Sequence, residues 1–174
     1  MHKILKKALF LDRDGVVNKE KYYLYKINDF EFIDGIFELC QYYLELGYLI
    51  FIVTNQSGIA RKYYNDNDFK VLSNWMNKEF LKNNIMISNI YYCPHHPDIS
   101  GSCDCRKPNT GMLFEAAKHF ELDLEASIII GDKESDIEAG INAGLKETYL
   151  FDEHQIVKSS KATKIINKLD KIWK

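Results

Sequence analysis

Residues 8–18 read Ala8-Leu9-Phe10-Leu11-Asp12-Arg13-Asp14-Gly15-Val16-Val17-Asn18, an apolar run that stops at two aspartates one residue apart. Four consecutive apolar residues before a charge predict a strand that is buried on both faces of a parallel sheet. Ligands of open α/β sheets bind in the crevice beyond the carboxyl ends of the strands. We therefore expect Asp12 and Asp14 at the mouth of such a crevice, with Arg13 turned the other way by strand alternation. An ordinary strand that runs into an Asp/Gly turn would give the same pattern.

The composition of the chain is that of a globular protein. Its 174 residues suit one domain, residues 1–174, and 46% apolar with 28% charged residues is typical of chains that fold around a core. A net charge of −2 favours neither nucleic acid nor an anionic membrane surface as a partner. No apolar run approaches the roughly 20 residues of a membrane-spanning helix, and residues 1–7 lack the apolar core of a signal peptide. We expect a cytoplasmic enzyme that acts as a monomer, with no nucleic-acid or membrane partner.

Strand and helix patterns alternate along the chain. After the first strand, apolar runs predict strands at 48–53, 87–92, 127–130 and 147–150. Helical periodicity predicts helices at about 34–46 with Asp34 as the cap, at 66–83, from 110 onward, at 135–143 and, as a closing helix, from 162. This alternation predicts an α/β fold with a doubly wound parallel sheet in a single domain. The intervals between these motifs are too short for a separate cap domain, so we expect only the loops 19–26, 56–64 and 93–105 to roof the crevice.

Polar groups follow three of these strands at the points where the strands end. They are Asp12 and Asp14 after the first strand, Thr54 and Asn55 after the second, and Asp132 with Asp136 after the fourth; Arg106 and Lys107 precede the intervening helix. Converging carboxylates repel one another unless a cation lies among them, and hard carboxylate oxygens without a nearby histidine suit Mg²⁺. A lysine, a hydroxyl and backbone N–H groups beside them suit the dispersed negative charge of phosphoryl transfer.

Three of the four cysteines gather in one loop with a histidine. The pattern is Cys93-Pro94-His95, seven further residues, and then Cys103-Asp104-Cys105. A set of three cysteines and one histidine is typical of structural zinc sites and leaves no ligand position open for water. Three reduced cysteines and a surface histidine are the alternative, but this spacing favours zinc.

Taken in order, Asp-x-Asp-Gly, Thr-Asn, Lys and Gly-Asp-x-x-x-Asp resemble the motifs of the haloacid dehalogenase-like (HAD-like) phosphatases, whose fold is Rossmannoid. Longer blocks are similar to one family among them, the D-glycero-D-manno-heptose 1,7-bisphosphate 7-phosphatases. These blocks are LFLDRDGVVN (9–18), FEFIDG (30–35), VTNQSGIAR (53–61), YYCPHHP (91–97), CDCRKPNTGML (103–113) and GDKESD (131–136). The resemblance spans residues 8–150. It implies a Mg²⁺-dependent phosphatase in the synthesis of ADP- or GDP-heptose for lipopolysaccharide or surface polysaccharide.

The resemblance also implies a role for each matching residue. Asp12 would be the nucleophile that forms an aspartyl-phosphate, and Asp14 would serve first as the acid and then as the base. Mg²⁺ would be held by the side chains of Asp12 and Asp132 and by the carbonyl of Asp14, while Thr54 and Lys107 would brace the phosphoryl group. Zinc would be structural and would stiffen the loop that carries Lys107; its ligands would be Cys93, His95, Cys103 and Cys105. The substrate, a small sugar bisphosphate, would contact Glu20, Lys21, Tyr22, Tyr23, Asn55, Gln56, Ser57, Arg106 and Lys133.

Several alternatives stay open at this point. Asp136 either supports the metal ligands or is simply an acid favoured in the first turn of a helix. Val16 stands where threonine is more usual, and we expect it to be tolerated. The short interval between His95 and Cys103 favours histidinol-phosphate phosphatase, whereas residues 56–61 favour the heptose family. A non-catalytic metal-binding module and a phosphotransferase to an alcohol are further alternatives. His96, beside the zinc ligands, is expected on the surface, as a bystander or facing the substrate. His2, His119 and His154 lie outside every motif and are given no role.

Overall fold

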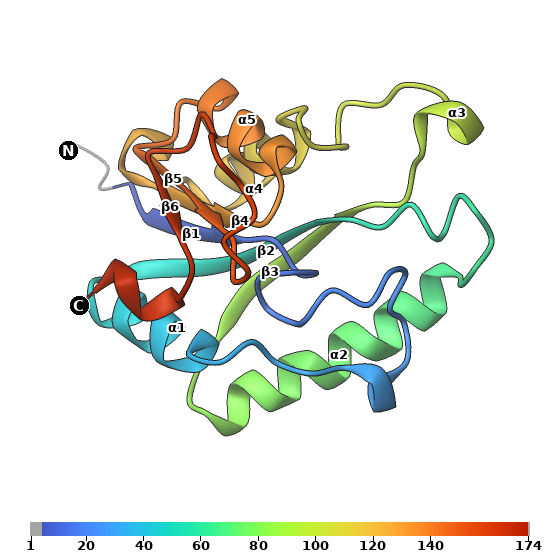
Figure 1. The fold of residues 1–174 in the computed structure, drawn as a ribbon, viewed down its shortest axis with the longest axis horizontal. Coiled ribbons are helices and arrows are strands. Elements are labelled where there is room, and N and C mark those ends of the chain that lie inside the picture. Colours follow the sequence, from blue (N-terminus) through green and yellow to red (C-terminus); the bar gives the residue numbers. More distant parts are fainter. Residues whose placement is uncertain (1–4, 174) are drawn as a thin grey trace.

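The computed structural model describes residues 5–173. Their strands form one six-stranded sheet in which every neighbouring pair is parallel, in the order β3-β2-β1-β4-β5-β6 (Figure 1). The strands are β1 (Lys7–Leu11), β2 (Tyr48–Asn55), β3 (Ile87–Cys93), β4 (Ile128–Gly131), β5 (Glu147–Phe151) and β6 (Lys164–Ile166). The predicted α/β fold with a doubly wound parallel sheet is confirmed. The strand order changes direction between β1 and β4, which is where ligands of such sheets bind.

Helices cover both faces of the sheet (Figure 1). On one face lie α1 (Ile36–Glu45) and α2 (Asp66–Lys82), and on the other lie α4 (Gly111–Phe120) and α5 (Glu134–Asn142). Shorter elements are α3 (Pro97–Ser100) and the 3₁₀ turns η1 (Ile27–Asp29), η2 (Leu124–Ala126) and η3 (Leu169–Ile172). Among residues 5–173, no helix has the length and apolar character needed to cross a membrane.

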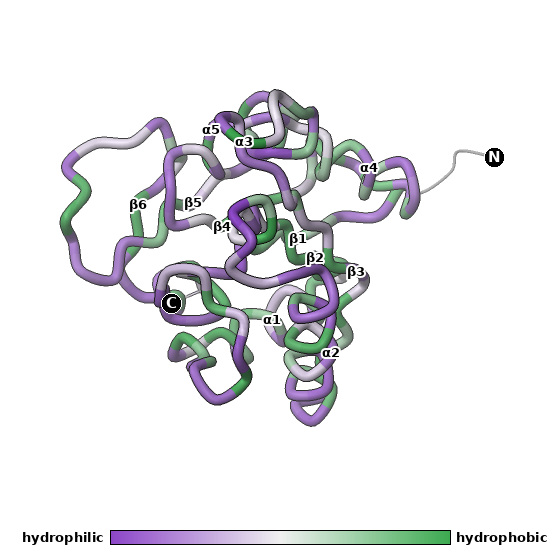
Figure 2. The backbone as a smooth tube through the Cα atoms, turned by 90° about the vertical axis from the view of Figure 1, so that its right-hand side faces the viewer, coloured by the Kyte–Doolittle hydropathy of each residue, from purple (hydrophilic) through white to green (hydrophobic). Residues whose placement is uncertain are grey.

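The core explains this layering through the alternation of β1. Leu9 and Leu11 pack with α1 and α2, whereas Ala8 and Phe10 pack with α4 and α5. Figure 2 shows the apolar segments gathered around the middle of the molecule and polar segments in the outer loops. Phe10 is fully buried against Phe51 of β2, with ring centroids 5.5 Å apart. Each such buried side chain stabilises the fold by roughly 1.5–3 kcal/mol, so the sheet holds its strand ends firmly in place.

The start of α1 differs from the prediction. The helix begins at Ile36, and its N-cap is Gly35 with φ 86°, without a side-chain cap from Asp34. Glycine adopts this left-handed conformation without the steric cost that other residues meet, so the turn is made by Gly35 rather than by a capping aspartate. The next long helix follows the prediction more closely, because Asn65 and Asp68 form a reciprocal capping box at the start of α2.

The predicted closing helix from residue 162 is wrong. Lys164–Ile166 form β6, parallel to β5, and Leu169–Ile172 form only a 3₁₀ turn. Thr148 and Thr163 draw the segment alongside β5 by exchanging hydrogen bonds from each backbone N–H to the other hydroxyl, at 3.0 and 3.1 Å. Ile166 and Leu169, whose spacing suggested a helix, are both buried in these short elements. Pairing with the open edge of β5 therefore outweighs helix propensity over so short a run.

Candidate active site

A cleft of about 800 Å³ opens at the carboxyl ends of the strands. Its walls come from the ends of β1, β2 and β4 and from the loops that follow them, because these strand ends meet at one edge of a parallel sheet. The predicted residues that line it are Asp12, Asp14, Glu20, Tyr22, Tyr23, Thr54, Asn55, Gln56, Ser57, Arg106, Lys107, Asp132 and Lys133. Lys21 is not brought to this cleft, since its ammonium donates to the Asp29 carbonyl at 2.8 Å and lies 3.5 Å from Glu31.

Three carboxylates and one lysine form the floor of the cleft. Oxygens of Asp12, Asp132 and Asp136 all lie within 4.8 Å of one another. The Lys107 ammonium lies 2.7 Å from Asp12 and 2.7 Å from Asp136, and it is buried with both of them. Asp136 is thus part of the cluster and holds the lysine, which goes beyond an ordinary acid at the start of a helix.

The charges in this cluster shift one another's protonation. Burial raises the pKa of Asp12 well above its usual range, the other two carboxylates raise it further, and the Lys107 ammonium opposes them. Burial likewise raises the pKa of Asp132 to about 6. Burial acts to lower the pKa of Lys107, but the carboxylates of Asp12 and Asp136 outweigh it, and the pKa of the ammonium is raised. Three carboxylates and one ammonium leave a net negative charge in the cluster, and an additional cation would neutralise it.

The residues fit a magnesium ion on two further observations. One oxygen of Asp132, Oδ1, is buried and has no hydrogen-bond partner in the described part of the chain. Gly15 gives the Asp132 carboxylate room, because a Cβ at position 15 would lie 2.3 Å from its Oδ2. Hard carboxylate oxygens are the ligands that Mg²⁺ takes, together with waters and a substrate phosphate. The Asp14 carboxylate is not in this set, so Asp14 could contribute only through its backbone.

Asp14 is held by Arg13. As predicted, Arg13 does not line the cleft, but its side chain contacts the Asp14 carboxylate, which the strand pattern did not predict. The Arg13 guanidinium is fully buried and donates to the Asp14 carboxylate at 2.9 to 3.2 Å and to the Leu24 carbonyl at 2.8 Å. Strand alternation stops at Leu11, and the chain then turns so that the amides of Val17 and Asn18 donate to the Arg13 carbonyl. The turn rather than the pleat therefore directs this side chain.

Asn55 holds the backbone of Lys107. Its amide nitrogen donates to the Lys107 carbonyl and its oxygen accepts from the Lys107 N–H, both at 3.1 Å. The Lys107 ammonium also donates to the Val53 carbonyl at 2.6 Å. Asn55 lines the cleft, but its amide positions the lysine instead of standing free for a substrate.

A loop that carries no motif also lines the cleft. His154 and Ile156, between β5 and β6, lie on its wall, so the expectation of three roofing loops missed a fourth. Asp152 shapes this loop by accepting a hydrogen bond from the Val157 N–H at 2.6 Å. Further along, the Glu134 carboxylate accepts from the Ser160 hydroxyl at 2.7 Å. Its place after a strand of the same parallel sheet was the available signal, because all such loops emerge at one edge.

The four predicted zinc ligands lie together. Cys93 Sγ is 3.5 Å from Cys103 Sγ and 2.7 Å from Cys105 Sγ, and His95 Nδ1 is 3.7 and 3.4 Å from the sulfurs of Cys93 and Cys105. A tetrahedral zinc with Zn–S bonds of about 2.3 Å requires sulfurs about 3.8 Å apart. The Cys93–Cys103 and Cys103–Cys105 pairs, at 3.5 and 3.6 Å, are close to that requirement, and the Cys93–Cys105 pair is shorter. Arg106 is tied to the same loop, since its guanidinium donates to the His95 carbonyl at 3.1 Å.

Known proteins are similar to this chain in sequence and in fold. A model of the HAD-hydrolase-like family matches residues 104–152. A D-glycero-alpha-D-manno-heptose-1,7-bisphosphate 7-phosphatase of Campylobacter jejuni is 56% identical over 149 residues, which are 86% of this chain and 84% of that protein. The chain belongs to the heptose-bisphosphate 7-phosphatase family. A D-glycero-beta-D-manno-heptose-1,7-bisphosphate 7-phosphatase of Haemophilus influenzae is 43% identical over 84% of this chain and 82% of that protein.

Two solved structures agree with membership of this heptose-bisphosphate 7-phosphatase family. A D,D-heptose 1,7-bisphosphate phosphatase of B. bronchiseptica, in complex with magnesium and phosphate, has a TM-score of 0.83 and 25% identity over 95% of both chains. A HAD-like phosphatase of Mesorhizobium loti has a TM-score of 0.84 and 30% identity, covering 93% of this chain and 80% of that one. The predicted resemblance is confirmed, and the chain is a phosphatase of phosphate monoesters. A non-catalytic metal-binding module is therefore excluded.

Proposed function

We propose that this chain removes the 7-phosphate of D-glycero-D-manno-heptose 1,7-bisphosphate in a Mg²⁺-dependent reaction. The observation that carries the proposal is the 56% identity with a phosphatase of that name over 86% of the chain. The cleft supports it, because a buried acid cluster with Lys107 lies at its floor and two further cations, Arg106 and Lys133, line its wall. Phosphates at both ends of a small sugar would find positive charge there.

The reaction proceeds in two displacements at phosphorus. The Asp12 carboxylate attacks the phosphorus atom, the bond from phosphorus to the sugar oxygen breaks, and Asp14 gives its proton to that oxygen. Asp14, now a carboxylate, takes a proton from a water whose oxygen attacks the same phosphorus. The bond between phosphorus and Asp12 breaks, and inorganic phosphate leaves. Lys107 and Thr54 stabilise the negative charge that spreads over the phosphoryl oxygens.

Magnesium would be held by Asp12 and Asp132 with the backbone of Asp14, and Asp136 would keep Lys107 in place beside them. When bound, the ion supplies positive charge next to the phosphoryl oxygens and orients them for in-line attack. The Asp12 side chain faces both Lys107 and the other acids. These contacts support the proposed role of Asp12 as the nucleophile.

Zinc on the loop that carries Lys107 would have a structural role. Three cysteines and one histidine fill all four positions of a tetrahedral zinc, which leaves none for water or substrate. The ligands lie on both sides of α3 and directly before Arg106. A zinc ion that held these ligands together would therefore fix the course of the segment that brings Arg106 and Lys107 to the cleft.

We also propose a cytoplasmic monomer, organised as a single domain, that serves the synthesis of ADP- or GDP-heptose. The three cysteines of the predicted zinc site, Cys93, Cys103 and Cys105, are free thiols, which suits a reducing compartment. The groups proposed for the chemistry, Asp12, Asp14, Thr54, Lys107 and Asp132, meet in one cleft of this chain, so a monomer would be sufficient for the reaction.

Histidinol-phosphate phosphatase is the second candidate, because seven residues separate His95 from Cys103. The test is to measure kcat/KM for both heptose bisphosphate anomers and for histidinol phosphate under the same conditions. We expect at least one heptose anomer to exceed histidinol phosphate by about a hundredfold, a difference of about 2.7 kcal/mol in transition-state binding. A preference for histidinol phosphate would overturn the proposal. The two anomers are compared because the relatives' names carry both.

A further inference from the structure

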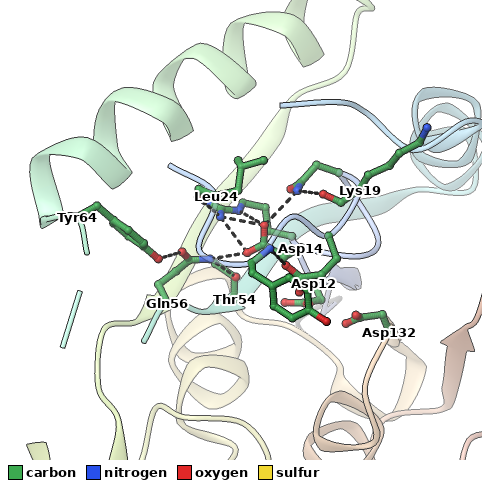
Figure 3. A network of polar contacts seen from close by, with 12 residues as sticks. Asp12, Asp14, Lys19, Leu24, Thr54, Gln56, Tyr64 and Asp132 are labelled. Carbon is green, nitrogen blue, oxygen red and sulfur yellow. Dashed lines mark hydrogen bonds and ion pairs between the residues drawn. The ribbon is translucent and has the colours of Figure 1, made fainter. Parts of the chain in front are cut away.

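Gln56 is predicted to contact the substrate, but its polar atoms already have protein partners. The side chain is 2% exposed. Its Nε2 donates to Asp14 Oδ2 at 2.9 Å and to Thr54 Oγ1 at 2.7 Å, and its Oε1 accepts from the Tyr64 hydroxyl. Figure 3 shows this line of contacts from Tyr64 through Gln56 to Asp14. Gln56 therefore joins Tyr64 to the proposed acid and base.

The orientation of the Gln56 amide matters because its two ends are chemically opposite. In its ionised form, which is the base of the second displacement, the Asp14 carboxylate can only accept hydrogen bonds, so the Gln56 NH₂ group faces it. The reversed amide would place its oxygen against a carboxylate oxygen, which is repulsive. The Tyr64 hydroxyl, by donating to Oε1, favours the orientation that directs the NH₂ group to Asp14 and Thr54.

Packing fixes the Tyr64 hydroxyl. The residue is 6% exposed, and its ring stacks on Tyr25 with centroids 5.4 Å apart and planes 16° from parallel. Gly58 lies directly against the same ring, since a Cβ at position 58 would be 2.2 Å from Tyr64 Cε1. The hydroxyl thus comes from a ring that has little room to move.

We propose that Tyr64 is a positioning residue for Asp14 and acts through the Gln56 amide. The inference rests on the proposed role of Asp14 as acid and base. Arg13 and Asn18 also donate to Asp14, so loss of the Tyr64 hydroxyl weakens the support of the carboxylate without abolishing it. The loss affects the chemical step and leaves substrate binding unchanged.

The first test compares Tyr64→Phe with Tyr25→Phe, because both variants keep the stacked rings and remove one hydroxyl. For Tyr64→Phe we expect kcat to fall roughly three- to tenfold, in the range of one lost hydrogen bond, with KM unchanged. The factor is the same for the heptose bisphosphate and for a small phosphate monoester. Tyr25→Phe keeps wild-type kcat. A raised KM with unchanged kcat would instead make Tyr64 a substrate contact, and equal rates for wild type and Tyr64→Phe would also overturn the proposal.

A double-mutant cycle with Gln56→Met tests whether Tyr64 acts through the amide. If it does, adding Tyr64→Phe to Gln56→Met slows kcat by no more than about twofold, because the hydroxyl no longer has an amide to orient. Multiplicative losses would refute an action through Gln56. If Gln56→Met does not fold, the two Tyr→Phe variants decide alone.

The Asp14→Asn variant distinguishes failure of the proposed role of Asp14 from failure of the positioning role of Tyr64. Near wild-type turnover would remove the proposed role of Asp14, whereas loss of turnover together with a silent Tyr64→Phe would refute only the positioning role.

Discussion

The ammonium of Lys107 lies 2.7 Å from a carboxylate oxygen of Asp12, although 95 positions separate the two residues in the chain. Lys107 reaches Asp12 from the loop that carries the predicted zinc ligands, and Asn55 holds its backbone from the end of β2. One side chain therefore links the proposed nucleophile to the proposed zinc site. A substitution at the proposed zinc site is therefore expected to alter turnover, because it disturbs the lysine that contacts the nucleophile.

Replacing the proposed nucleophile tests its chemistry without changing its shape. In Asp12→Asn we expect kcat to fall by at least about a thousandfold, because an amide cannot form the aspartyl-phosphate. The fold should persist, since Lys107 keeps its contact with Asp136. Steady-state turnover and thermal melting check the two parts. The matched control is Asp98→Asn, an exposed acid outside the cleft. Turnover of Asp12→Asn within about tenfold of wild type would refute the assignment.

Asp132 is expected to hold magnesium through an oxygen that has no protein partner in residues 5–173. In Asp132→Asn, the Mg²⁺ concentration for half-maximal activity should rise by about tenfold or more, a loss of at least about 1.4 kcal/mol in binding. Mg²⁺ should also raise the melting temperature of the wild type and raise that of the variant much less, because an ion that binds only the folded state stabilises it. An unchanged Mg²⁺ requirement would speak against this ligand.

Zinc is expected to support the loop that delivers Lys107. The purified, reduced protein should contain about one zinc ion per chain. Cys103→Ser should lose zinc, melt at a lower temperature and turn over more slowly on every substrate. Cys40→Ala is the control, because Cys40 is buried away from the ligand set and should keep the zinc content unchanged. Absence of zinc from wild-type protein, or full activity without it, would contradict this role.

Arg106 and Lys107 are adjacent but should serve different phosphates. Lys107 contacts the nucleophile, so Lys107→Ala should slow the bisphosphate and a small monophosphate ester alike. Arg106 lines the cleft with a planar guanidinium suited to a second phosphate. Arg106→Ala should therefore cost about 1.5–3 kcal/mol in kcat/KM for the bisphosphate and leave the monophosphate nearly unchanged.

The contact from Arg106 to His95 makes zinc content the necessary control for this comparison. If Arg106→Ala keeps its zinc, a selective loss on the bisphosphate reports on the second phosphate. Equal losses on both substrates would show that Arg106 serves the reacting phosphate, and the evidence for a bisphosphate would weaken.

The sheet and the acid cluster could be predicted because their signals are local. Runs such as Ala8 to Leu11 end at polar residues, and parallel strands bring those ends to one edge, which places Asp12 near Asp132. The contact between Arg13 and Asp14 could not be predicted, because a turn after β1 replaces the alternation of the strand. Short-range pattern alone does not report where a chain leaves its regular geometry.

Other features depend on partners that lie far away in the sequence. The tail pairs with β5 through Thr148 and Thr163, so its helical spacing was misleading. Asn55 ends β2, a place suited to a substrate-binding residue, yet its amide is occupied by the backbone of Lys107. His154 reaches the cleft only because β5 ends at the same edge as the strands that carry motifs. None of these contacts has a signature in the segment itself.

Phosphorus NMR of the reaction with D-glycero-D-manno-heptose 1,7-bisphosphate and Mg²⁺ tests the proposed function most directly. The two ester signals are distinguishable, because one phosphate is on the anomeric carbon and the other on a primary carbon. We predict that the signal of the 7-phosphate disappears, that inorganic phosphate appears in equal amount, and that the 1-phosphate remains. The Asp12→Asn variant should leave both signals in place. Loss of the 1-phosphate signal, transfer of the phosphate to an alcohol, or no reaction would contradict the proposal.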